Sequence, residues 1–220
     1  MTTPPQIRAP KPTPLSGEEV VAGTDATVVD FWRFALSNLR MNNARGYLAE
    51  FLMAKAVGST GLRIEWDPYD VLAPDGTTIE VKISAYLQAW DQYKLSTIQF
   101  TGLRSRIWTT EDGLTPTPTY NADVYVFAIQ TARTHEEYNS LLASQWRFHV
   151  LPRQTVEDLG QESISLATLE KLAGPLITYG EPSKTTPTLD LPQVARTPTV
   201  ISKERKRWPT THSPMPHLRH

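Results

Sequence analysis

The sequence predicts an α/β fold in which a mixed central sheet is flanked by helices. Three observations indicate this class. Apolar residues recur at helical spacing near both ends of the central part of the chain, whereas the residues between them alternate with a period of two. The chain has 220 residues, of which 40% are hydrophobic, and this is enough to bury one core. Helices that flank a run of strands are typical of α/β proteins.

Two helices are expected before the strands. The first is predicted at 25–40, where apolar residues follow helical spacing and Thr24 or Asp25 can serve as the N-cap. The second is predicted at 43–57, and Gly58 follows it at the position where helices commonly end in a left-handed glycine.

The remaining elements are mostly strands. Ala73 to Gly76 read Ala-Pro-Asp-Gly, which predicts a turn between two short strands. A further helix is expected at 164–172. Strands are expected at 62–66, 69–72, 78–83, 96–101, 122–129 and 146–151.

The composition excludes several classes of protein. The chain has no cysteine, which excludes disulfide scaffolds, thiolate zinc sites and cysteine nucleophiles. It has no uncharged apolar run of about 18 residues, so we expect no membrane-spanning helix and no membrane partner. The first residues lack the apolar stretch of a secretory signal, and a cytoplasmic location is therefore expected.

Proline and charge divide the chain into three segments. Five of the 18 prolines fall within residues 1–14 and seven within residues 181–220. The last forty residues hold seven basic and three acidic side chains, so they carry +4 and leave −5 for the rest of the chain. We therefore predict a disordered proline-rich arm at 1–17, a folded domain at 18–180 and a disordered, basic, proline-rich tail at 181–220.

The candidate site lies on the two strands that the predicted turn joins. If the turn closes a hairpin, Asp70 lies directly opposite Glu80 on one face of the sheet, and strand alternation places Lys82 and Ser84 on that same face. Two carboxylates in direct cross-strand contact repel each other and weaken a sheet. A divalent cation between them reverses the sign of this interaction.

This set of residues suits phosphodiester hydrolysis. Hard carboxylate oxygens with an open coordination shell favour Mg²⁺ or Mn²⁺ that keeps water and meets phosphate. A lysine ammonium beside the metal orients water and offsets charge on the attacked phosphate. Glu50 lies among small and apolar residues of the helix at 43–57, so we expect it to point inward toward a partner, either the metal or a base such as Arg45.

The pattern resembles a known superfamily of nucleases. Asp70, followed after nine residues by Glu80-Val81-Lys82 and preceded by a helical Glu50, resembles the PD-(D/E)XK nucleases, which include restriction endonucleases, repair nucleases and junction resolvases. The resemblance implies that Asp70, Glu80 and the carbonyl of Val81 bind the metal. It implies that Lys82 serves the attacking water and that Glu50 is an auxiliary carboxylate at the metal.

The resemblance covers roughly residues 40–130 and implies a restriction-endonuclease-like core. Gln88 falls where several branches place a glutamine, and the candidate substrate-binding residues are Ser84, Gln88 and Arg45. One departure is that Tyr69, and not proline, precedes the metal-binding aspartate. The literal Pro-Asp pair lies in the turn, where Asp75 is interpreted as a turn residue.

The implied function is Mg²⁺-dependent endonuclease cleavage of DNA, in defence against foreign DNA or in repair. Two alternatives remain open: a non-catalytic protein that binds DNA or another partner on a nuclease fold, and an RNA-directed nuclease. A homodimer would suit double-strand cleavage.

Other charged residues receive simpler interpretations. Glu65 and Asp67 are expected to face solvent, and His149 is expected to have a hydrogen-bonded structural role on its strand. The basic cluster at 203–208 is a candidate nucleic-acid contact or a solubilising segment.

Overall fold

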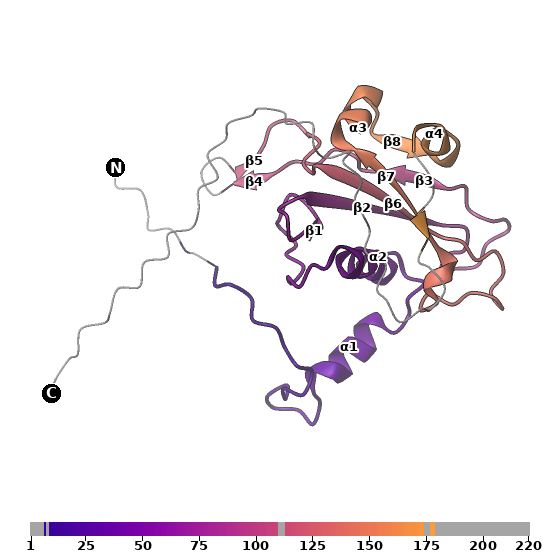
Figure 1. Cartoon of the computed structure of the whole chain (residues 1–220). Coiled ribbons are helices and arrows are strands. Elements are labelled where there is room, and N and C mark those ends of the chain that lie inside the picture. Colours follow the sequence, from indigo (N-terminus) through magenta and orange to yellow (C-terminus); the bar gives the residue numbers. More distant parts are fainter. Residues whose placement is uncertain (1–6, 8, 110–112, 174–176, 179–220) are drawn as a thin grey trace, which may run out of the picture.

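A five-stranded mixed sheet forms the centre of the molecule. The computed structural model describes residues 7, 9–109, 113–173 and 177–178. Strand β2 pairs in parallel with β6, and the other neighbouring strands of the sheet pair antiparallel. Helices lie on both faces of the sheet, which confirms the mixed α/β class (Figure 1). In spatial order the strands are β1 (Val71–Leu72), β2 (Thr78–Ala85), β6 (Val124–Gln130), β7 (Trp146–Pro152) and β9 (Ile177–Thr178).

Helix α2 (Asn42–Val57) covers one face of this sheet. Its small and apolar residues Ala49 and Met53 are fully buried against alternate side chains of the strands, among them Ile79 and Trp146. The helix ends where Gly58 adopts a left-handed φ of 72° and its N–H donates to the carbonyl of Lys55. The predicted helix and its glycine stop are confirmed.

The opposite face packs against a second layer. This layer contains β3 (Gln99–Thr101), α3 (Arg153–Leu159), β8 (Ser163–Ser165) and α4 (Leu166–Leu172). Phe100 of β3 meets Phe127 of β6 edge to face, with 5.1 Å between the ring centroids. Because all seven residues of β6 are buried, this strand is the centre of both core clusters.

The hairpin of β1 and β2 has the register that the sequence predicts. Val71 pairs with Ile79 and Leu72 with Thr78. In the turn, the N–H of Gly76 donates to the carbonyl of Ala73, and Gly76 has a φ of 90°. A positive φ at this position explains why the turn needs glycine.

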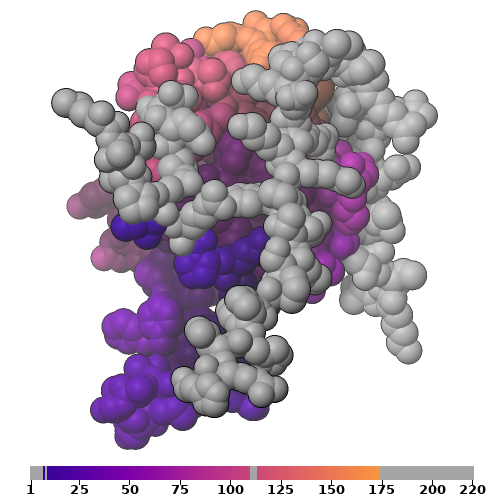
Figure 2. Space-filling model, turned by 90° about the vertical axis from the view of Figure 1, so that its left-hand side faces the viewer, coloured from indigo at the N-terminus to yellow at the C-terminus, as the bar shows by residue number. Residues whose placement is uncertain are grey.

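Helix α1 (Val28–Leu36) is shorter than expected and stands apart from the core. It begins after Thr27, because the Asp30 carboxylate accepts hydrogen bonds from the N–H and the hydroxyl of Thr27, at 2.9 and 2.8 Å. Thr24, one of the two predicted caps, instead closes a turn by donating to the carbonyl of Val21. No residue of α1 is buried, and the helix projects from the body of the molecule (Figure 2).

The predicted strand at 62–66 is wrong. These residues form a loop, and Trp66 is 71% exposed. A strand needs a hydrogen-bonding neighbour, but β1, at the edge of the sheet, pairs only with β2. Alternation without such a neighbour does not produce a strand.

Several short elements were not predicted. They are α3, β8, a small hairpin of β4 (Trp108–Thr109) and β5 (Gly113–Leu114), and the 3-10 turn at Ala143–Gln145. Residues 7 and 9–16 contain no helix or strand, and the predicted tail at 181–220 lies outside the described residues. Within the described part of the chain, no helix is long and apolar enough to cross a membrane.

His149 is buried at a core position on β7. The predicted hydrogen-bonded role of its side chain is wrong for one of the two ring nitrogens. In the described part of the chain, Nδ1 has no hydrogen-bond partner. The side chain lies at the wall of a cavity that Leu166 and Glu170 of α4 also line.

Candidate active site

Asp70 lies immediately before β1, at the edge of the sheet. Its N–H donates to the carbonyl of Ile79 at 3.0 Å, and its Oδ2 accepts a 2.7 Å hydrogen bond from the N–H of Val81. The Asp70 carboxylate therefore takes the place of a backbone carbonyl as the acceptor for the Val81 N–H of β2. Because the N–H and the carbonyl of one strand residue point to the same side, the carbonyl of Val81 faces the Asp70 side as well.

Glu80 and Lys82 lie on the other face of β2 from α2. Their side chains form an ion pair, with 2.6 Å between Nζ of Lys82 and Oε1 of Glu80. Both are largely enclosed, with 15% of the Glu80 side chain and 21% of the Lys82 side chain exposed. Gly102 lies close by, since a Cβ added to it would lie 3.8 Å from Nζ of Lys82. β2 thus holds the Glu80 carboxylate and the Lys82 ammonium next to each other, and both are largely shielded from solvent.

Glu50 points inward from α2, and its partner is Arg63. The two side chains are joined by a 2.5 Å contact between Oε2 of Glu50 and Nε of Arg63. The guanidinium also lies over the ring of Tyr47, 4.8 Å from its centroid. Glu50 therefore forms its ion pair with Arg63 and not with Arg45. Arg45 instead hydrogen-bonds Leu87, Asn42 and Gln88.

Electrostatics at this edge disfavour negative charge in the absence of a cation. Burial raises the pKa of Glu50 to about 7, and the nearby Asp70 contributes to this rise against the opposing effect of Arg63. Burial also raises the pKa of Asp70, although the Val81 N–H and Lys82 act in the opposite direction. The pKa of Glu80 is raised by burial and by Asp70, against the attraction of Lys82.

These residues suit a hard divalent cation. Asp70 and Glu80 supply carboxylate oxygens, and the Val81 carbonyl supplies a neutral oxygen, which is the donor chemistry that Mg²⁺ and Mn²⁺ prefer. In the described ranges, no three His, Asp or Glu side chains stand close enough together to enclose a metal ion. Two carboxylates and one carbonyl would leave further coordination positions to water.

A groove of about 530 Å³ leads to this edge. Its walls come from α2, from the loop at 58–64 and from the segment at 67–74. The charged residues that line it are Glu50, Arg63, Asp67 and Asp70. Three acids against one base make the groove acidic, so it favours a cation over an unaccompanied polyanion.

Arg45, in the first turn of α2, contacts Gln88 of the segment after β2. Arg45 is only 3% exposed, and its guanidinium donates to the carbonyl of Leu87 at 2.9 Å, to Asn42 at 2.7 Å and to Gln88 at 3.0 Å. These contacts hold the segment after β2 against the helix. The substrate-binding role of both residues stays a prediction.

Ser84 lies half-buried on β2, on the same face as Glu80 and Lys82, which is the placement that alternation predicts. Its role in substrate binding stays a prediction. Asp67 is exposed, as expected, but it also lines the groove, and partial burial raises the pKa of its carboxyl.

Arg63 is the site residue that sequence reasoning missed. Its place in a predicted strand concealed it, and the sequence offers two bases between Glu50 and Asp70, Lys55 and Arg63, with nothing to choose between them. Comparison with known proteins adds no assignment, because no family model matches the chain and no curated protein shows significant similarity to it.

Proposed function

We propose that this chain is a metal-dependent endonuclease that hydrolyses DNA phosphodiester bonds on a restriction-endonuclease-like core. One observation carries the proposal. Asp70 and Glu80, two desolvated carboxylates with raised pKa values, lie on adjoining chain segments, and Lys82 contacts Glu80. Such an arrangement is costly for a purely structural purpose, because like charges repel across strands.

The order of elements supports the same proposal. A helix that carries Glu50 precedes the hairpin that carries Asp70 and Glu80, and the chain then crosses over to β6, which is parallel to β2. This order agrees with the resemblance to PD-(D/E)XK nucleases over residues 40–130.

Each residue would have a defined task. Asp70, Glu80 and the Val81 carbonyl would hold the cation, and a bound Mg²⁺ or Mn²⁺ would supply charge stabilisation and an activated water. The Lys82 ammonium would orient that water and offset charge on the phosphate. Glu50, whose pKa of about 7 lies near neutral pH, would accept a proton at the groove and keep Arg63 in place.

A second candidate is a non-catalytic protein that binds DNA or another partner. The observation that favours it is that Lys82 and Arg63 already neutralise Glu80 and Glu50 through direct contacts. In such a protein, the ion pairs of Glu80 with Lys82 and of Glu50 with Arg63 would stabilise the edge of the sheet in place of a metal, and no catalysis would follow. An RNA-directed nuclease would use the same residues as a DNA-directed one.

A cleavage assay separates these candidates. The full chain is incubated with plasmid DNA, single-stranded DNA and RNA, in Mg²⁺, in Mn²⁺ and in EDTA. The proposal expects metal-dependent cleavage of DNA. Binding without cleavage under every condition would favour the second candidate, and cleavage of RNA alone would favour an RNA-directed nuclease.

Lys82→Gln tests the mechanism itself. We expect cleavage to fall by about 100-fold or more, the range seen when one group that stabilises developing charge is removed. Lys171→Gln, on α4, removes an exposed positive charge elsewhere and should leave cleavage unchanged. Circular dichroism checks that the variant folds, because Glu80 loses its partner. Full cleavage by a purified, folded Lys82→Gln protein would contradict the assigned role.

A further inference from the structure

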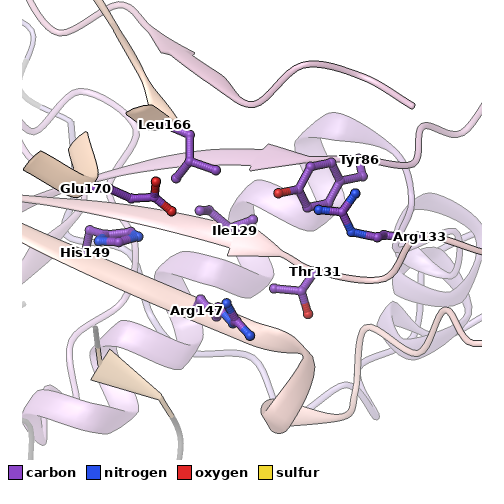
Figure 3. Close-up of a pocket in the computed structure, with 8 residues that line it drawn as sticks. All are labelled: Tyr86, Ile129, Thr131, Arg133, Arg147, His149, Leu166 and Glu170. Carbon is purple, nitrogen blue, oxygen red and sulfur yellow. The ribbon is translucent and has the colours of Figure 1, made fainter. Parts of the chain in front are cut away.

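A second cavity, of about 410 Å³, lies on the same face of the sheet as Glu80 and Lys82, beyond the C-terminal end of β2. It is bounded by the ends of β2 and β6, by the start of β7 and by α4 (Figure 3). Tyr86 follows Lys82 by four positions, which corresponds to about 13 Å along an extended chain. The cavity shares no lining residue with the groove at Asp70.

One side of this cavity is cationic. Arg133 stacks over the ring of Tyr86, with its guanidinium 4.1 Å from the ring centroid. Arg147 lies across from it on β7. Among the described residues, neither arginine forms an ion pair with an acid, and both are exposed at the cavity. Two guanidinium groups are thus available to an anion.

The other side combines an acceptor with an unsatisfied imidazole. His149 is 5% exposed, and its buried Nδ1 has no hydrogen-bond partner among the residues that the structure describes. Figure 3 shows the Glu170 carboxylate and the His149 ring extending into the cavity from one side, with the Tyr86 hydroxyl on the opposite side. The Glu170 carboxylate can accept hydrogen bonds from a ligand there, and the edge of the His149 ring that borders the cavity adds a polar group beside it.

We propose that this cavity binds a small ligand of the nucleoside monophosphate class. The two guanidinium forks match the oxygens of a phosphate. Glu170 and His149 would bind the polar edge of the base, with Glu170 accepting from its N–H groups. Ile129 and Leu166 supply apolar walls for a planar ring. The volume lies within the range of about 300–1,000 Å³ for small-molecule sites.

Nuclear magnetic resonance of the imidazole groups tests this site directly. The full chain, in EDTA so that the groove holds no cation, is titrated with GMP, with AMP and with inorganic phosphate at constant ionic strength. The His149 resonance is identified by its disappearance in His149→Gln. We expect a saturable shift of this resonance with nucleotide and a weaker one with inorganic phosphate, whereas the signal of the exposed His135 stays fixed.

Matched variants distinguish the proposed site from non-specific binding. Arg147→Gln and Arg133→Gln should each weaken nucleotide binding at least tenfold. Arg40→Gln is the control, because Arg40 also stacks over a tyrosine, Tyr138 at 4.7 Å, but lies outside the cavity, and it should bind normally. Glu170→Gln should weaken nucleotide binding without weakening that of inorganic phosphate.

Three outcomes would overturn the proposal. One is the absence of any His149 shift with nucleotide or phosphate, and another is equal affinity in the arginine variants and the parent. The third is much tighter binding of a 5′-phosphorylated tetranucleotide than of the mononucleotides, because this would identify a strand end and not a free small molecule as the ligand. Since the cavity and the groove are separate, none of these outcomes depends on nuclease activity.

Discussion

At the scale of single residues, Glu50 shows how burial controls the charge of the site. Only 13% of its side chain is exposed, and Asp70 and Glu80 both oppose its ionisation. Arg63 offsets part of this cost but not all of it, since the pKa still rises to about 7. Glu50 therefore gains and loses its proton near neutral pH, where a bound cation can displace the proton.

The raised pKa of Glu50 makes the protein less stable as pH rises. A carboxyl whose folded pKa exceeds its unfolded value near 4.5 stabilises the fold fully below pH 4.5, and this contribution is lost as pH rises through about 7. The shift corresponds to a loss on the order of 3 kcal/mol. In EDTA, Glu50→Gln should remove this dependence and unfold at higher denaturant concentration than the parent at pH 8.

Urea unfolding at pH 4.5, 6, 7 and 8 checks this expectation. Glu65→Gln is the control, because Glu65 is exposed and its replacement should leave the pH profile of the parent intact. If Glu50→Gln and the parent lose stability equally between pH 4.5 and 8, the Glu50 carboxyl does not titrate in that range.

At the scale of elements, the hairpin of β1 and β2 links stability to metal binding. The Asp70 carboxylate accepts from the Val81 N–H, an interaction that an asparagine oxygen can also make. Asp70→Asn should therefore be at least as stable as the parent in EDTA, because it removes a repulsion on the order of 0.5–1 kcal/mol. Asp70→Ala, which has no such acceptor, should be less stable than Asp70→Asn.

Magnesium should reverse the order of the parent and Asp70→Asn. For a site of about 1 mM affinity, about 10 mM Mg²⁺ stabilises the parent by roughly 1.4 kcal/mol. The variant should be stabilised much less, since it lacks one charged ligand. Thermal melts at fixed ionic strength, with Asp75→Asn in the turn as control, measure the difference. Equal Mg²⁺ shifts in the parent and Asp70→Asn would show that Asp70 is not a ligand.

Arg45 joins two elements, and its removal should be costly. The buried Arg45 guanidinium donates hydrogen bonds to Leu87, Gln88 and Asn42. Arg45→Ala therefore removes three hydrogen bonds and leaves a cavity beside α2. We expect a loss of about 2–4 kcal/mol in unfolding free energy. Arg33→Ala, which removes an exposed ion pair on α1, should cost less than about 1 kcal/mol. If Arg45→Ala and Arg33→Ala lower the unfolding free energy by a similar small amount, Arg45 does not hold the segment after β2 against α2.

The elements that could be predicted from the sequence are those whose signals are local. The Ala73–Gly76 turn and period-two alternation predict the Val71–Ile79 register, and Gly58 predicts the end of α2. Contacts between distant segments were not predictable in this way. Arg63 reaches Glu50 from a loop that alternation alone presents as a strand, and β8 forms only because β3 pairs with it.

At the scale of the whole molecule, the face of the sheet that carries Glu80 also carries the second cavity. β2 carries Glu80 near its start, and Tyr86 follows directly after its end. β6 pairs with β2 over seven residues and keeps it rigid. The two sites differ in charge, because acids dominate the groove whereas two arginines line the cavity. One rigid strand therefore connects a site suited to a cation with a site suited to a phosphate.

Charge is also divided along the chain. Residues 1–180 carry −5, so this part of the chain repels a polyanion, whereas residues 181–220 carry +4. Deletion of 181–220 should therefore weaken binding to duplex DNA. The melting temperature should change little, because this sequence has few apolar residues to pack.

The salt dependence of DNA affinity shows whether the tail binds phosphate. For each DNA phosphate that only the tail neutralises, its deletion should reduce the slope of log affinity against log salt by about 0.9. A variant with glutamine at Lys203, Arg205, Lys206 and Arg207 keeps the length of the chain, and it separates charge from tethering. If charge is what matters, this variant should reproduce most of the change that the deletion causes, in affinity and in slope. An unchanged slope in both proteins would mean that the segment is a spacer.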